Sequence, residues 1–143
     1  MSAYTDQNSI LGEIQLMDLI ALTDDSPKTG NVNQTVLTQL IANASGEIDR
    51  LVGNVYDVPF NPVPPSVASM ALVIACYRLY RRREVPDEKN KFAKDYYETR
   101  KFLNAVHSRE DVLDLSVSAD FDQVQFNARP TIYGFGNILP NTM

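Results

Sequence analysis

The sequence is poor in the side chains on which catalytic and metal centres most often depend. Its 143 residues include one cysteine, Cys76, one histidine, His107, and no tryptophan. A single cysteine excludes both an internal disulfide framework and a zinc site built from cysteines. A lone histidine with no catalytic motif around it provides no pair of groups for nucleophilic or acid–base catalysis. We therefore expect a protein that is not an enzyme and that holds no cofactor and no metal.

Long apolar runs and an excess of basic side chains are missing as well. No run of apolar residues reaches the length of a membrane span and no signal-peptide pattern is present, so we expect a soluble intracellular protein. The 18 acidic and 13 basic residues give a net charge of −5, whereas free-standing nucleic-acid-binding domains are usually basic. With 44% hydrophobic and 22% charged residues, the composition is that of one ordinary globular domain.

The charges are distributed unevenly along the chain. Residues 1–77 carry two basic and eight acidic side chains, residues 78–101 carry nine and five, and residues 102–143 carry two and five. An acidic beginning, a basic middle and an acidic tail suit a protein that meets its neighbours through complementary surfaces. Solvated helix faces would give the same distribution, and the sequence leaves both interpretations open.

Two short helices are predicted near the start of the chain. Apolar residues recur at helical intervals over residues 10–22. Gly12 interrupts this pattern and divides it into two pieces, and Thr5 or Asp6 is placed to cap the first.

The clearest predicted helix spans residues 33–52. Its apolar residues fall on one side, Asn33 or Thr35 can cap its start, and Gly53 is placed to end it as a C′ residue. Gly46, in the middle, is either a tolerated surface glycine or a point where another backbone approaches closely.

A proline-rich connector and a second long helix follow. Four prolines between residues 55 and 65 exclude a continuous helix there. In the predicted helix at 66–83, Ser69 and Arg78 are the only strongly polar residues between positions 67 and 80. Apolar residues on every side of a helix indicate that it is central or that a neighbouring subunit covers it.

Four arginines, Arg78, Arg81, Arg82 and Arg83, gather at the end of this helix. Cations at a helix C-terminus complement its dipole, by about 0.3–1 kcal/mol each. The same cluster is a candidate surface for an acidic partner or a neighbouring subunit. Both explanations stay open, and we treat the four arginines as candidate interface residues.

The last predicted helix begins at Asp87, which can cap it after Pro86, and runs to about Val106. Together these segments predict an all-α fold, a small bundle of about four to five helices within residues 1–106.

Residues 107–143 are predicted to form an extended, partly irregular C-terminal arm. Leu113, Leu115 and Val117 alternate with polar residues, which is a weak strand signal. The large apolar residues of the arm are too many for an idle tail and too irregular for a second domain. Such a segment orders against a partner or folds back on its own helices. The candidate interface residues here are Phe121, Phe126, Arg129, Tyr133 and Phe135.

Several short stretches, taken in order, carry a family resemblance. They are Gly12-Glu13-Ile14, Leu22-Thr23-Asp24, Glu47-Ile48-Asp49, Val55-Tyr56-Asp57-Val58-Pro59 and Ala75-Cys76-Tyr77-Arg78-Leu79-Tyr80-Arg81-Arg82. Over about residues 4–103, with a weaker match at residues 128–136, the sequence resembles the small neck protein family of Mu-like phages and prophages.

The resemblance implies a head-to-tail connector, or adaptor, of a tailed bacteriophage virion. It implies a subunit of a ring, usually of twelve copies, that binds the portal protein and receives a stopper or tail-completion protein. Packaged DNA would pass through the ring without sequence-specific binding. The implied location is the virion neck, after synthesis in the host bacterial cytoplasm, with no contact with a membrane. The alternative is a standalone helical binding module of phage origin, regulatory or DNA-associated, which the net charge disfavours.

Overall fold

The computed structural model describes residues 3–25 and 28–116, and the chain is helical there. No strand occurs in these two ranges. The expected all-α class and the expected number of helices are confirmed. The helices are α1 (Gln7–Leu11), α2 (Leu16–Thr23), α3 (Gln34–Val52), α4 (Pro65–Arg82) and α5 (Ala93–His107), with a 3-10 turn η1 (Asp87–Lys89) before α5.

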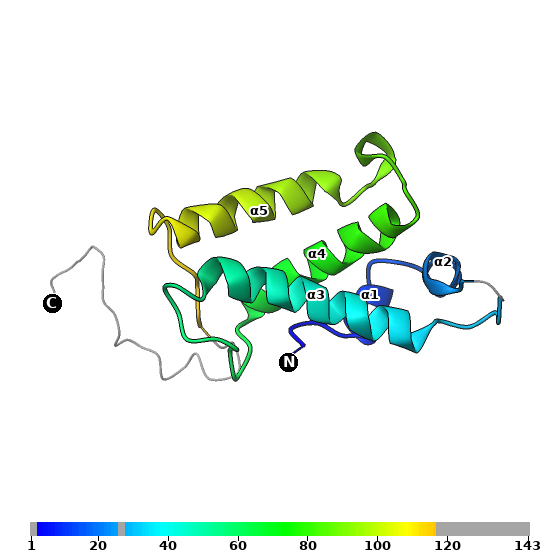
Figure 1. Ribbon diagram of the computed structural model, residues 1–143, viewed down its shortest axis with the longest axis horizontal. Coiled ribbons are helices and arrows are strands. Elements are labelled where there is room, and N and C mark those ends of the chain that lie inside the picture. The colour runs from blue at the N-terminus through cyan, green and yellow to red at the C-terminus, as the bar shows by residue number, and fades with distance from the viewer. Residues whose placement is uncertain (1–2, 26–27, 117–143) are drawn as a thin grey trace, which may run out of the picture.

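The three long helices form the body of the molecule, and α4 is its centre. Helices α3, α4 and α5 each pack against the other two, and α4 also contacts α1 and α2 (Figure 1). Its apolar residues therefore face neighbours on several sides, and this central position accounts for the lack of a polar side. Its fully buried members, each 0% exposed, are Val67, Ala71, Ile74, Ala75, Cys76 and Leu79.

Side-chain caps begin two of the helices at the predicted positions. The Asp6 carboxylate accepts a hydrogen bond of 2.8 Å from the Ser9 amide at the start of α1. The Asn33 side chain accepts one of 3.1 Å from the Val36 amide at the start of α3. Gly12 follows the end of α1 and separates it from α2, as predicted.

The predicted start of the last helix was wrong by six residues. Asp87 lies in η1, and α5 begins at Ala93. The Asp87 carboxylate does not cap a helix; it accepts hydrogen bonds from the hydroxyls of Tyr77 and Tyr97, at 3.0 and 2.9 Å. The buried Asn90 also joins this turn to α4, because its side-chain amide donates to the Tyr77 carbonyl at 3.2 Å. Contacts between α4 and α5 thus override the local helix signal.

Gly46, within α3, and Gly53, at its end, have different roles. Gly53 ends the helix with a right-handed φ of −65°, not with the left-handed conformation typical of a C′ glycine. A Cβ at Gly53 would lie 2.7 Å from the carbonyl oxygen of Asp49, so the lack of a side chain is needed for space. Around Gly46, no atom of the described residues lies within 4 Å of the position of a Cβ, which fits a surface glycine.

The first part of the predicted arm packs on the body. Leu113 is buried, and its amide donates to the Tyr56 hydroxyl at 3.0 Å. The Ser66 hydroxyl donates to the carbonyl of Asp114. Residues 108–116 contain no strand, so the weak strand signal there was misleading. The remainder of the predicted arm, residues 117–143, lies outside the described residues.

Candidate interaction surfaces

A buried carboxylate, Glu47, joins the three long helices. Its side chain is 0% exposed and forms ion pairs with Arg78 of α4 and, at 3.2 Å, with Arg100 of α5. The Tyr96 hydroxyl donates to the same carboxylate at 3.0 Å. A buried charge is tolerated when opposite charges and hydrogen bonds surround it, as they do here. Arg78, predicted as an interface residue, therefore has a structural role within the chain.

Aromatic packing next to Glu47 reinforces the contact between α4 and α5. The rings of Tyr77 and Tyr96 stack with centroids 4.0 Å apart and an interplanar angle of 5°, and Tyr97 meets Tyr77 edge-on. Burial raises the pKa of the Tyr96 hydroxyl, so it stays protonated as the donor to Glu47. Tyr77 and Tyr96 are thus part of the core of the body, whereas Tyr97 is 49% exposed.

Two of the remaining arginines bind the loop that follows α2. Arg82 pairs with the Asp25 carboxylate and donates to the Leu22 carbonyl at 3.0 Å. Arg83 pairs with the same carboxylate at 3.0 Å. The hydrogen bond from Arg82 holds the pKa of Asp25 below its usual value, so the carboxylate stays charged at neutral pH. These contacts attach the loop to the end of α4.

Arg81 differs from its neighbours in the cluster. It is exposed, and its one side-chain hydrogen bond within the described residues goes to the Tyr77 hydroxyl at 3.2 Å. No carboxylate in that part of the chain lies within ion-pair distance of its guanidinium. Arg81 is therefore the arginine of this cluster best placed to meet another molecule.

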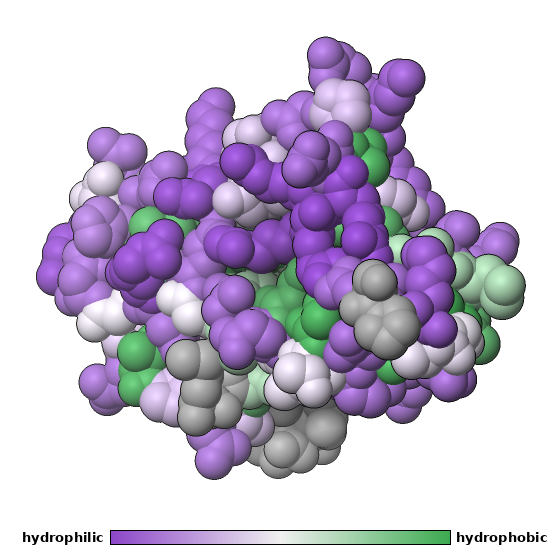
Figure 2. Space-filling view, turned by 45° about the vertical axis from the view of Figure 1, so that its right-hand side comes forward, coloured by the Kyte–Doolittle hydropathy of each residue, from purple (hydrophilic) through white to green (hydrophobic). Residues whose placement is uncertain are grey.

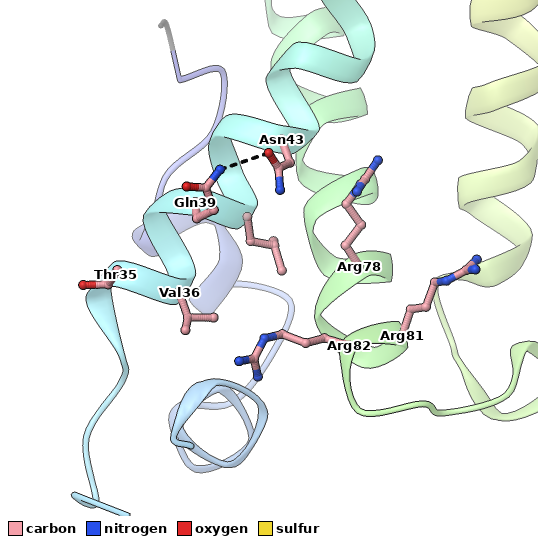
Figure 3. A pocket seen from close by; sticks show the side chains of 8 residues that line it. Thr35, Val36, Gln39, Asn43, Arg78, Arg81 and Arg82 are labelled. Carbon is pink, nitrogen blue, oxygen red and sulfur yellow. Dashed lines mark hydrogen bonds between the residues drawn. The ribbon is translucent and has the colours of Figure 1, made fainter. Parts of the chain in front are cut away.

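An open groove of about 540 Å³ lies between the first half of α3 and the last turns of α4. Helix α4 contributes every charged residue of the lining, and α3 contributes polar and apolar ones. Figure 3 shows Arg78 and Arg82 on the α4 side and Gln39 and Asn43 on the α3 side, with the Arg81 side chain extending away from α3. The lining residues are Arg78, Arg81, Arg82, Thr35, Val36, Gln39, Leu40 and Asn43.

The charge in and beside this groove is strongly positive. The guanidinium groups of Arg78 and Arg100 share the Glu47 carboxylate, those of Arg82 and Arg83 share the Asp25 carboxylate, and Arg81 forms no ion pair within the described residues. On the α3 side, residues 29–46 include no charged residue at all. The groove therefore combines an excess of positive charge with an uncharged wall, which favours an acidic ligand or partner over a basic one.

The family assignment agrees with the sequence resemblance. The model of the family described as Bacteriophage Mu, Gp36 matches residues 4–129. The chain belongs to this Gp36 family. No curated protein has significant sequence similarity to it. The match covers every helix described above. It also extends beyond residue 103, where the resemblance seen in the sequence becomes weaker. The match confirms the expected relationship of this chain to proteins of Mu-like phages.

In this Gp36-family protein, large apolar side chains are exposed at both ends of the body. Leu16 and Met17 on α2 are 51% and 73% exposed, and Val112 and Leu115 after α5 are 71% and 41% exposed. Figure 1 places α2 at one end of the molecule and the segment after α5 at the other. The face in Figure 2 is mainly hydrophilic, with hydrophobic residues visible in patches.

The candidate site residues of the sequence analysis fall into two groups. The four arginines lie together at the end of α4, as their spacing predicted. The five residues of the predicted arm lie outside the described residues, so their role as interface residues stays a prediction. These are Phe121, Phe126, Arg129, Tyr133 and Phe135.

Sequence reasoning missed Glu47 as the partner of the arginines. A signal was present, because Glu47 lies three residues after Ala44 and four before Leu51, on the apolar side of the helix. Within the described residues, no three histidine, cysteine or acidic side chains are grouped as metal ligands. No helix there has the length and hydrophobicity needed to cross a bilayer.

Proposed function

We propose that this Gp36-family protein is a structural subunit of a head-to-tail connector. In this role it forms a ring, of twelve copies by the family resemblance, that joins the portal protein to a stopper or tail-completion protein in the virion neck. DNA passes through the ring without sequence-specific recognition. The role is one of contact, and we assign no catalytic activity to the chain.

The observation that carries this proposal is the exposure of apolar side chains at opposite ends of a well-packed body. Leu16 and Met17 at one end, and Val112 and Leu115 at the other, each leave 41–73% of their surface in contact with water. Exposed apolar surface of this kind marks a site of protein contact when it is clustered. A subunit within a ring has neighbours on two sides, which would cover both ends.

The sequence of the predicted arm gives further support. Its large apolar residues, four of which are candidate interface residues, suit a segment that packs on a portal protein or on an adjacent subunit. In this proposal Phe121, Phe126 and Tyr133 contribute most of the contact, because large aromatic side chains dominate interface energies.

The proposal is tested by removing the protein from a phage that encodes it. Loss of a connector should leave filled heads and free tails that do not join, and supply of the intact chain from a plasmid should restore infectious particles. Electron microscopy and plaque counts measure the two outcomes. Normal numbers of tailed, infectious particles without the protein would rule out the connector role.

A truncated chain tests the arm within the same assay. We expect a chain that ends after residue 116 to stay folded, because the described body lies before that point, but to be lost from purified particles. Unchanged incorporation would show that the arm makes no essential contact. Tight binding of the purified chain to duplex DNA, with a steep dependence on salt, would instead favour the regulatory or DNA-associated alternative.

A further inference from the structure

The groove between α3 and α4 carries positive charge that the described residues do not neutralise. Four guanidinium groups in and beside it, those of Arg78, Arg82, Arg83 and Arg100, share the two carboxylates of Glu47 and Asp25, which leaves an excess of two positive charges among these ion pairs. Arg81, at its edge, forms no direct ion pair in the part of the chain that the structure describes, and the Tyr77 hydroxyl, which it contacts at 3.2 Å, lies between it and Asp87. Such a surface is stabilised when a segment rich in carboxylates lies in it, because guanidinium–carboxylate contacts are strong, charge-assisted hydrogen bonds.

The same chain contains a segment with the opposite charge. Residues 110–122 include five acidic residues and no basic one, and the rest of the chain has 13 acidic and 13 basic residues. The net charge of −5 therefore equals the charge of this one segment. Apolar residues are interspersed with the acids: Val112, Leu113, Leu115, Val117 and Phe121.

The described part of this segment presents its charges and part of its apolar surface to water. Glu110, Asp111 and Asp114 are exposed. Val112 and Leu115 are 71% and 41% exposed. A segment that combines acidic and apolar side chains is complementary to this groove, because the groove has arginines along one wall and Val36 and Leu40 in its uncharged lining.

The segment and the groove lie at opposite ends of the body (Figure 1). Hydrogen bonds to Tyr56 and Ser66 hold residues 113 and 114 beside the start of α4. The groove lies beside residues 78–82 at the end of α4, about 18–24 Å away at about 1.5 Å per residue. Residues 110–116 are thus separated from the groove of their own molecule by the length of the helix.

We propose that the groove between α3 and α4 binds residues 110–122 of a second copy of this chain. Contact between unlike surfaces at opposite ends of a subunit is heterologous, and a series of such contacts closes into a ring when the rotation allows it. The inference rests on the proposed function, since it identifies the contact between adjacent subunits of the connector. Residues 29–46 present no acidic side chain that would repel the incoming segment.

Paramagnetic relaxation in mixtures of two forms of the full chain tests this contact. One form is ¹⁵N-labelled wild type, and the other is unlabelled and carries a nitroxide at Val112→Cys. Native Cys76 is 0% exposed and should not take the label. Because the ¹⁵N-labelled copies carry no nitroxide, signal broadening reports contact between copies. We expect broadening of the Gln39 and Asn43 amides that disappears at about 0.5 M salt, where the screening length is a few ångströms.

Charge-reversal variants connect this broadening to the groove. Arg81→Glu in the ¹⁵N-labelled copy should weaken the contact by about threefold to tenfold, because a favourable charge pair becomes a repulsive one. The matched control is Arg50→Glu, an exposed arginine near the other end of α3, which should leave the broadening unchanged. Changing Glu110 and Asp111 to lysine in the nitroxide copy should restore part of the contact with Arg81→Glu.

Two results would overturn the inference. One is the absence of broadening at Gln39 and Asn43 at millimolar concentration and low salt. The other is broadening that is the same in the wild type and in Arg81→Glu. Either result leaves the connector role to the particle assay, which does not depend on this groove. Conversely, if phage without the protein still form tailed, infectious particles while the relaxation data are positive, the chain self-associates through this groove but is not a connector.

Discussion

The Glu47→Gln variant removes a negative charge from the centre of the body while keeping the size of the side chain. In the wild type this carboxylate receives Arg78, Arg100 and the Tyr96 hydroxyl, and its side chain is 0% exposed. A glutamine keeps one oxygen acceptor and turns the other acceptor into a donor. One guanidinium then faces an NH₂ group instead of an oxygen, and both lose the opposite charge.

The structure sets the expected magnitude. Removal of one partner of a buried ion pair typically costs about 3–5 kcal/mol, because a charge is left without compensation. Here the released Arg78 and Arg100 side chains are 36% and 34% exposed, so water can rehydrate them in part. We therefore expect a smaller loss, about 2–3 kcal/mol of unfolding free energy. For a chain of this size the melting temperature should fall by about 6–12 °C.

Thermal and urea unfolding, followed by circular dichroism, measure this loss. The matched control is Glu98→Gln, an exposed glutamate on α5, which should change the unfolding free energy by less than about 0.5 kcal/mol. An equal urea m-value for wild type and variant would show that both unfold in the same way. If Glu47→Gln proves as stable as Glu98→Gln, the buried carboxylate does not hold the three helices together, and our reasoning is refuted.

Three further variants or probes test single contacts. Tyr4→Phe removes a hydroxyl that donates to Asp49 at 2.5 Å, so urea unfolding should show a loss of about 1–2 kcal/mol. Since burial raises the pKa of Tyr4 to about 12, the wild type should also lose stability between pH 10 and 12, and Tyr4→Phe should lose less. Asp25→Asn should lower the melting temperature at pH 7. Because Arg82 lowers the pKa of Asp25, this difference from the wild type should vanish as the pH falls well below 4, and a difference that persists at low pH would contradict the assignment. Burial raises the pKa of the Cys76 thiol to about 12, so a thiol reagent at about pH 8 should modify it only after unfolding, and fast modification of the native protein would contradict the burial.

The long helices were predictable because local signals and packing agree in them. In α3 the apolar residues lie on one side and Asn33 caps the first turn, so the sequence pattern and the folded structure coincide. In α4 the apolar residues on every side indicated a central or covered helix, and its contacts with four other helices explain why no polar side is needed.

The start of α5 was not predictable from its own sequence. Asp87 after Pro86 has the pattern of a helix start, but its carboxylate binds Tyr77, ten residues earlier, and Tyr97, ten residues later. A single-sequence pattern contains the local preference and not the competing contact. The helix therefore begins at Ala93, after the turn that these tyrosines stabilise.

In the groove between α3 and α4, the basic side was predictable from the sequence and the uncharged side was not. Four arginines close together are conspicuous, whereas Gln39, Asn43 and Thr35 across the groove have no chemical signature. Glu47 lies more than thirty positions before its partner Arg78, a separation that only the fold closes. The arginine cluster was found for its charge, but its division into structural arginines and the exposed Arg81 required coordinates.

Electron cryo-microscopy of the virion neck is the most direct test of the connector role. We predict a ring of copies of this chain, with helices α3, α4 and α5 fitting the density as one body, between the portal protein and the first protein of the tail. Density for the neck that these helices do not fit, in particles that assemble and infect normally, would contradict the account.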